Sequence, residues 1–160
     1  MVRNAIGGWK LSGIYTASSG PSFTVNGGGG NNNSGLDQFQ DRADIVPGVP
    51  LNIRKGGRSN WLNQYMNPKA FQENAFGTPG NVPKYNIQQP PLQDVDLALL
   101  KDFAYHENRN IEFRFEAFNA LNHPSFAQPV AEFGDPNFGK INKAGPINPR
   151  VLQAALKLTF

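Results

Sequence analysis

The chain has 160 residues, of which 39% are hydrophobic and 17% charged, with a net charge of +3 and no cysteine. The lack of cysteine excludes disulfides, thiolate metal sites and a cysteine nucleophile, and the small, scattered basic excess argues against nucleic acid as a partner. Gly, Asn and Pro make up for the low hydrophobic and charged fractions, and they favour turns and extended segments over packed helices.

Residues 8–18 alternate between two kinds of side chain, which predicts a strand with two different faces. Trp9, Leu11 and Tyr15 fall on one face, and most of the polar residues fall on the other. A Ser-Gly-Pro break at 19–21 precedes a short extended segment at 22–25. No signal peptide is predicted, because residues 1–8 contain no sustained apolar core. No apolar run approaches the roughly 20 residues of a spanning helix.

Residues 26–91 are predicted to be mostly loop. The Gly- and Asn-rich run 26–35 predicts a flexible loop, and its four glycines do not form a phosphate cradle because no Lys-Ser/Thr follows them. The Pro-rich remainder has isolated apolar residues that we expect to anchor it locally: Val46, Leu51, Trp61, Leu62, Tyr65, Phe71 and Phe76. Connections of this length are uncommon in compact domains and are typical of the extracellular side of a barrel.

Two further strands are predicted before the last loop. Residues 92–105 place Val95, Leu97 and Leu99 on one face and Asp94 and Asp96 on the other. Residues 111–117 alternate almost strictly, with Ile, Phe, Phe and Ala on one face and Glu, Arg and Glu on the other, so Phe113 and Phe115 are expected to face lipid or an apolar partner. Residues 118–149 carry turn signals and form another loop.

The segment 150–160 predicts a final strand with one wholly apolar face. Its alternate residues from 152 to 160 are Leu, Ala, Leu, Leu and Phe, and the opposite face is mixed and includes Gln153, Lys157 and Thr159. Such a strand suits a wall with lipid on one side and a polar lumen on the other.

Several segments in order resemble the end of the TonB-dependent outer-membrane receptors, in the group with a carboxypeptidase-regulatory-like N-terminal domain. The most specific are Gly-Gly-Trp-Lys-Leu-Ser-Gly-Ile-Tyr at 7–15, Asp-Val-Asp-Leu-Ala-Leu-Leu-Lys-Asp-Phe at 94–103, and Phe-Arg-Phe-Glu-Ala-Phe-Asn-Ala-Leu-Asn-His-Pro-Ser-Phe at 113–126. The segment 88–91 (Gln-Gln-Pro-Pro) departs from the family, whose members tend to have a Gly-Pro-Gly turn there. A last strand ending in Phe160 is similar to the terminal signature of outer-membrane barrels.

The resemblance implies an all-β fold, with residues 1–160 forming the terminal four to five antiparallel strands of a larger barrel and no complete second domain. The family barrel has about 22 strands, so we expect the chain to be part of a longer protein in the outer membrane of a Gram-negative bacterium. That parent would import a scarce nutrient. The implied partners are outer-membrane lipid, the remainder of the barrel, and the barrel-assembly machinery, which would bind the strand ending in Phe160. No cofactor is implied.

Two alternatives remain open from the residues alone. A soluble β-rich hydrolase would act on a glycan through the paired carboxylates Asp94 and Asp96 or Glu112 and Glu116, since glycosidases use two carboxylates about 5 to 9.5 Å apart and strand neighbours at i and i+2 lie about 6.6 Å apart. Arg114 between Glu112 and Glu116 favours a salt-bridged wall instead.

The second alternative is a soluble carbohydrate-binding module, whose candidate ligand-binding residues are the loop aromatics Trp61, Tyr65 and Phe71. No metal site is predicted, because His106 and His123 each lie in turn-like sequence without a second ligand at helical or strand spacing. No Gly-x-Ser-x-Gly nucleophile elbow is present in the sequence.

Overall fold

A computed structural model of the chain describes residues 7–36, 40–53, 57–106 and 109–160, and this part is almost entirely β-structure and loop. The chain divides into two compact units. We call them the sheet unit (Met1–Ser18, Leu92–Ser125 and Ile147–Phe160) and the loop unit (Ser19–Pro91 and Phe126–Pro146). The predicted all-β, antiparallel fold is confirmed.

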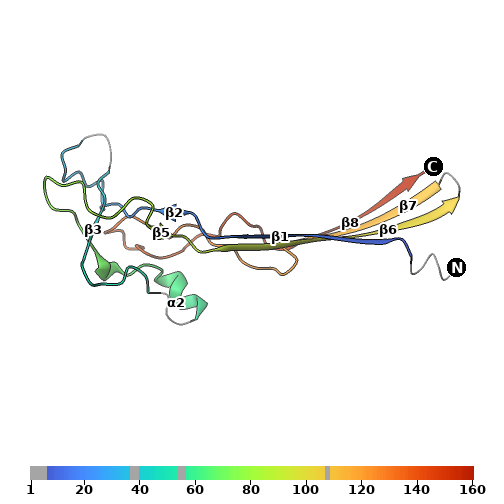
Figure 1. Cartoon of the computed structure of the whole chain (residues 1–160), viewed down its shortest axis with the longest axis horizontal. Helices are drawn as coiled ribbons and strands as arrows, with labels where there is room; N and C mark the ends of the chain where they lie inside the picture. Colours follow the sequence, from blue (N-terminus) through green and yellow to red (C-terminus); the bar gives the residue numbers. More distant parts are fainter. Residues whose placement is uncertain (1–6, 37–39, 54–56, 107–108) are drawn as a thin grey trace. The chain divides into compact units, whose positions relative to one another are not determined.

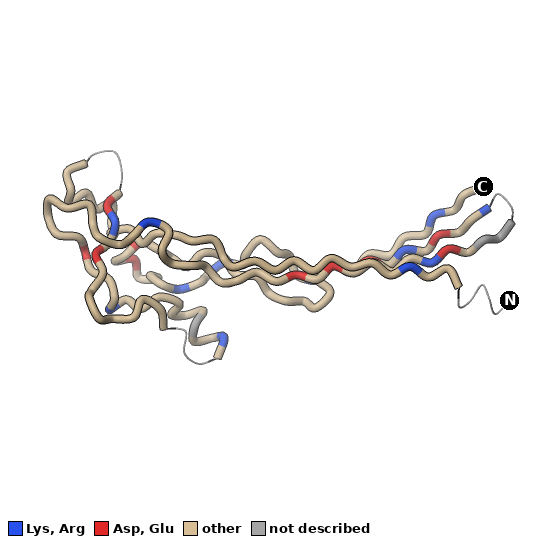
Figure 2. Tube along the Cα trace, viewed as in Figure 1, with Lys and Arg blue, Asp and Glu red and all other residues tan. Residues whose placement is uncertain are grey.

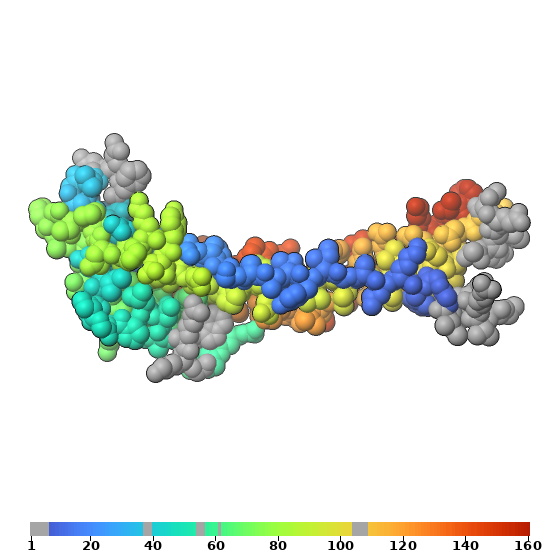
Figure 3. All heavy atoms as spheres, in the orientation of Figure 1, coloured from blue at the N-terminus to red at the C-terminus, as the bar shows by residue number. Residues whose placement is uncertain are grey.

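The sheet unit is one antiparallel sheet with the strand order β1-β6-β7-β8 (Figure 1). Its strands are β1 (Trp9–Ser18), β6 (Leu92–His106), β7 (Arg109–Phe118) and β8 (Val151–Thr159). The strands predicted at 8–18, 92–105, 111–117 and 150–160 are therefore confirmed. The atoms of β1 are visible along the strand in Figure 3, and all ten of its residues are exposed.

The register of the sheet keeps like side chains together. Leu11 pairs with Leu99, Leu99 with Phe115, and Phe115 with Ala154, so one apolar row crosses all four strands. Cross-strand pairs of aromatic and aliphatic side chains contribute about 0.2–1 kcal/mol each. Because side chains alternate along a strand, the neighbouring row, which runs through Ser12 and Glu116, lies on the opposite face.

The loop unit contains only short elements. β2 (Ser22–Phe23) pairs with β5 (Ile87–Gln88), and β3 (Asp44–Ile45) pairs with β4 (Phe71–Gln72). A six-residue helix, α2 (Arg58–Asn63), and a 3₁₀ turn, η1 (Pro68–Ala70), also belong to it. The sequence pattern predicts neither helical segment, since neither is long enough to show an amphipathic period.

Buried apolar side chains give the loop unit a core of its own. Phe71 and Phe133 each meet Phe138 edge to face, with ring centroids 5.5 Å apart in both pairs. Burying one such side chain contributes about 1.5–3 kcal/mol. The remaining buried members are Phe23, Val25, Ala43, Tyr65, Met66, Ala70, Val82, Ile87 and Ile141. The prediction that Phe76 anchors the loop is wrong, because this residue is 91% exposed.

The Gly- and Asn-rich run 26–35 is a loop, but polar contacts hold it. The buried Asp41 carboxylate accepts hydrogen bonds from the Ser34 hydroxyl at 2.6 Å, the Ser34 amide at 2.8 Å and the Asn74 side chain at 3.0 Å. The Ser34 hydroxyl is the main cause that holds the pKa of Asp41 below its ordinary value, although burial opposes it. The prediction of flexibility missed these contacts, because Asn74 lies far along the sequence.

A glycine in the same run marks the place where two loop segments touch. A Cβ atom at Gly28 would lie 1.8 Å from the carbonyl oxygen of Phe133, which is closer than any real contact allows. The adjacent backbone is tied by hydrogen bonds from the Asn26 amide to the Ala131 carbonyl at 3.0 Å and from the Phe133 amide to the Asn26 carbonyl at 2.9 Å. Glycine is therefore a packing requirement at this position.

Gly28→Ser is expected to destabilise the loop unit by about 1–3 kcal/mol, because the added side chain forces the two segments apart. The matched control is Gly57→Ser, since a Cβ at Gly57 meets nothing within 4 Å and serine suits the position before α2. Hydrogen exchange of the amides of Asn26 and Phe133 measures the effect. Equal exchange in the two variants would show that the segments do not need this close approach.

Candidate functional site

The sheet unit has one nearly continuous apolar face. The residues on it contact one another along the pairing rows, and many are exposed although they are large and apolar. They are Trp9, Leu11, Tyr15, Val95, Leu97, Leu99, Phe103, Ile111, Phe113, Phe115, Leu152, Leu156 and Leu158. An exposed apolar surface of this extent marks an interaction with a partner or a membrane. The predicted placement of Phe113 and Phe115 on the apolar face is confirmed.

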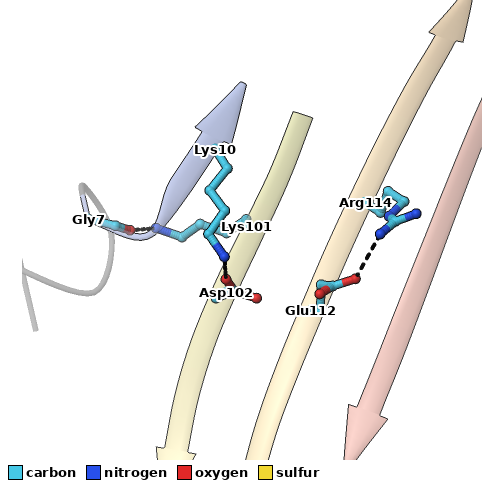
Figure 4. Close-up of polar contacts among 6 residues, drawn as sticks. All are labelled: Gly7, Lys10, Lys101, Asp102, Glu112 and Arg114. Carbon is cyan, nitrogen blue, oxygen red and sulfur yellow. Dashed lines mark hydrogen bonds and ion pairs between the residues drawn. The ribbon is translucent and has the colours of Figure 1, made fainter. Parts of the chain in front are cut away.

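The opposite face carries the charges of the sheet. Lys10 Nζ donates to Asp102 Oδ2 at 2.8 Å, and Arg114 lies 3.6 Å from Glu112 (Figure 4). Arg114 also lies 3.7 Å from Glu116. Figure 2 shows these basic and acidic residues interleaved toward the end of the sheet where Phe160 lies. We call this set the charge ladder: Lys10, Asp102, Glu112, Arg114, Glu116 and Lys157.

The charge ladder tolerates one unfavourable pair. Asp102 stands directly opposite Glu112, where two like charges repel. Lys157 lies opposite Glu112 on its other side, and Lys10 pairs with Asp102. Each acidic side chain therefore has a basic neighbour, and the ladder holds three of each sign. Exposed pairs of this kind contribute little stability one by one, and they make this face suited to water.

The four carboxylates considered for glycan hydrolysis lie on this same polar face. Glu112 and Glu116 are both ion-pair partners of Arg114. Asp96 Oδ1 accepts the Asn119 amide at 2.9 Å, and Asp94 stands opposite Thr16 with one carboxylate oxygen buried and unpaired among the described atoms. Asp96 thereby caps the turn after β7, and the glutamates belong to the charge ladder. The described contacts of Asp96, Glu112 and Glu116 are therefore structural.

The structure contradicts the sugar-stacking prediction for two of the three loop aromatics, Tyr65 and Phe71. Tyr65 is 1% exposed and its hydroxyl donates to the Gln88 carbonyl at 2.7 Å, while Phe71 is buried in the loop-unit core. Neither ring has a face accessible to a ligand, because both rings are packed in the apolar core of the loop unit. Trp61 belongs to α2, and its side chain lies outside the described part. No group of three His, Cys, Asp or Glu that could hold a metal ion occurs among the described residues.

Among the described side chains of β6, Lys101 is the one ionisable group on the apolar face. Its side chain is 1% exposed, its Nζ lies 4.9 Å from the Trp9 ring centroid and 5.2 Å from that of Phe103, and it donates to the Gly7 carbonyl (Figure 4). Two cation–π contacts and a hydrogen bond thus compensate for the burial of the ammonium group. The sequence signal for this residue was a lysine at an apolar position of the alternation, between Leu99 and Phe103.

Comparison with known protein families gives a match over most of the chain. The family model of an outer membrane beta barrel domain matches residues 1–153. Searches of curated proteins and of solved structures found no match. Within the described residues, no helix is both long and apolar enough to cross a membrane.

Lys101→Glu is expected to destabilise the sheet far more than Lys101→Met. The carboxylate would face two electron-rich rings and the Gly7 carbonyl oxygen, whereas methionine keeps the packing of the stem and loses the cation–π contacts and the hydrogen bond to Gly7, about 1–2 kcal/mol. Thermal unfolding of both variants in lipid vesicles measures the difference. Equal losses would mean that the charge of Lys101 contributes nothing and only the packing of its stem matters.

Proposed function

The chain belongs to the outer membrane beta barrel domain family, and on this premise we propose that it forms part of the wall of a TonB-dependent receptor. The receptor imports a scarce nutrient across the outer membrane of a Gram-negative bacterium. The observation that carries the proposal is the two-faced sheet, with exposed apolar side chains on one face and the charge ladder on the other.

A lipid bilayer is the environment that both faces fit. In water, exposed leucine and aromatic side chains would be covered by a partner, whereas in a barrel wall they contact lipid while the polar face lines the lumen. The strand lengths support this, since β1, β7 and β8 have 10, 10 and 9 residues. A tilted membrane strand needs about 9–11 residues.

The connections between strands support one orientation in the membrane. The long segment 19–91 joins β1 to β6, and the segment 119–150 joins β7 to β8. Both segments leave the same end of the sheet, because Ser18 pairs with Leu92 and Phe118 pairs with Val151 there. β6 and β7 are joined at the other end by 107–108 alone. Outer-membrane barrels have long loops outside the cell and short turns in the periplasm, which would put the loop unit outside.

Two open edges support the view that other strands complete the wall. Within the described residues β1 pairs only with β6, and β8 pairs only with β7. Open edges do not occur in the hydrocarbon region of a bilayer, because each unpaired backbone group costs several kcal/mol there. The remainder of a barrel, with about 22 strands in receptors of this kind, would pair with both edges.

The resemblance of segments 7–15, 94–103 and 113–126 to TonB-dependent receptors supports energy-coupled uptake as the activity of the whole protein. Transport makes and breaks no bonds, and the role of this chain within it is to separate lipid from lumen. A solute or a plug inside the barrel would contact the polar face of the sheet.

Leu11→Arg is expected to lower the yield of folded barrel in the membrane, whereas its neighbour Ser12→Arg is tolerated. Leu11 lies on the apolar face and is 75% exposed, so arginine there would enter lipid at a cost of up to about 2–4 kcal/mol. Arginine at Ser12 would join the row of Glu116 on the polar face.

The two variants are placed separately in the gene that encodes the chain, and folded protein is quantified in the outer-membrane fraction. A soluble protein would tolerate both, since both side chains are exposed. Equal yields would therefore contradict the membrane-wall assignment.

Phe160→Ala is expected to reduce the amount of barrel that reaches the outer membrane, because we propose that the assembly machinery binds β8 through this residue. The Phe160 ring is 97% exposed, so its loss removes almost no packing within the chain. Phe76→Ala is the control, since that ring is also exposed and lies in the loop unit. Membrane yield equal to that of the control would remove the proposed role.

Deletion of the gene is expected to lower the uptake of at least one scarce nutrient supplied at limiting concentration. The same uptake should fall in the parent strain when an uncoupler dissipates the proton-motive force, because the proposed transport is energy-coupled. Uptake is measured with a labelled nutrient panel before and after the uncoupler. Uptake unaffected by deletion across the panel, or insensitive to the uncoupler, would contradict the transport assignment while leaving the membrane wall intact.

A further inference from the structure

Two hollows of the loop unit share one exposed aromatic residue, Tyr85. The first, of about 510 Å³, is lined by Ser22, Asn52, Tyr85, Asn86 and Gln88. The second, of about 360 Å³, has Tyr85 beside Thr24, Leu36 and Lys84 among its lining residues. Both volumes fall in the range of small-molecule sites, about 300–1,000 Å³. An extended ligand could occupy both hollows across this one ring.

Residues that line the first hollow are adjacent to buried residues of the loop-unit core. In the β2–β5 pair, Phe23 stands opposite Ile87 and both are buried, whereas Ser22 stands opposite Gln88 on the exposed side. Asn52 is tied to the buried Met66 through an isolated backbone bridge. The polar lining is therefore positioned by buried neighbours, which limits the cost of ordering it when a ligand binds.

Tyr85 is displayed by an unusual backbone conformation. Its φ of 54° is in the left-handed region, which is uncommon for a residue other than glycine, asparagine or aspartate. The Tyr85 amide donates to the Thr24 hydroxyl at 2.9 Å, which helps to hold this conformation. The side chain is 71% exposed, so the ring lies at the surface beside the hollows. Strained residues of this kind gather at binding sites.

We propose that the Tyr85 site binds a neutral oligosaccharide. A sugar presents C–H groups that stack on an aromatic ring and hydroxyls that pair with amide and hydroxyl side chains, and the first hollow offers one ring, three amides and a serine. None of the described side chains that line it carries a charge. In the second hollow Asp41 is engaged by Ser34 and Asn74, and Arg42 by the Val82 carbonyl.

The inference deepens the proposed function and rests on it in one respect, because the loop unit must lie outside the cell to meet such a ligand. It would make a neutral oligosaccharide the substrate class of the receptor. The stacking residue is then Tyr85, and not the loop aromatics Tyr65 and Phe71 that the sequence indicated.

The test uses the full-length protein in detergent and a panel of neutral gluco-, xylo-, manno- and galacto-oligosaccharides, with binding measured by calorimetry. Tyr85→Asn removes the ring and keeps a residue that tolerates the left-handed conformation, and Tyr85→Phe keeps the ring. Phe76→Ala is the matched control, since it removes another exposed aromatic of the same unit that is not among the lining residues of either hollow. Unchanged thermal unfolding confirms that each variant is folded.

At least one oligosaccharide is expected to bind the unaltered protein, with about tenfold or greater weakening in Tyr85→Asn and little change in Tyr85→Phe and Phe76→Ala. No binding by any panel member, or equal weakening in Tyr85→Asn and Phe76→Ala, would overturn the site. Tighter binding of charged oligosaccharides than of any neutral one, in a second panel measured in the same way, would overturn the neutral ligand class. Any of these results with membrane location and energy-coupled uptake intact would refute the site alone.

Discussion

The register of β6 against β1 and β7 is the constraint on which the rest of the sheet depends. Side chains alternate along each strand, so a slip of one residue would move every side chain of that strand to the opposite face. With the observed register, Leu99 meets Leu11 and Phe115, and Asp102 meets Glu112. A slip would place carboxylates among the aromatic rings of the apolar face, where their burial without partners costs several kcal/mol. The two environments on either side of the wall therefore select one register.

Charge is handled differently on the two faces. On the polar face, the charge ladder balances acidic and basic side chains in pairs that remain partly exposed. These pairs add little stability, and their main effect is to keep this face hydrated. On the apolar face, Lys101 is covered by the rings of Trp9 and Phe103 and donates to the Gly7 carbonyl. A lysine with a long apolar stem suits this position, since the stem packs while the ammonium group finds a polar atom.

The loop unit shows how long irregular connections become ordered without long strands. Its apolar core forms around Phe71 and Phe138, and a separate polar cluster forms around Asp41, Ser34 and Asn74. Both clusters act against the cost of ordering the segments, which is about 1–2 kcal/mol of backbone entropy for each residue fixed in place. Together they position the short β2–β5 pair, which in turn sets the polar side chains beside Tyr85. The proposed binding site is thus a consequence of the packing beneath it.

The sequence by itself determined the strands of the sheet, their two faces and the assignment to an outer-membrane barrel. Alternation at 8–18, 111–117 and 150–160 is a local property of neighbouring residues, and a period of two is enough to assign both strand and face. The sequence also indicated that Glu112 and Glu116 belong to a salt-bridged wall, because Arg114 lies between them on the same face. Only the tertiary structure decided which loop aromatics are buried, that Asp41 and Asn74 hold the glycine-rich run, and that Lys101 lies under Trp9. These outcomes depend on contacts between residues far apart in the chain, and no local pattern records which distant segments meet.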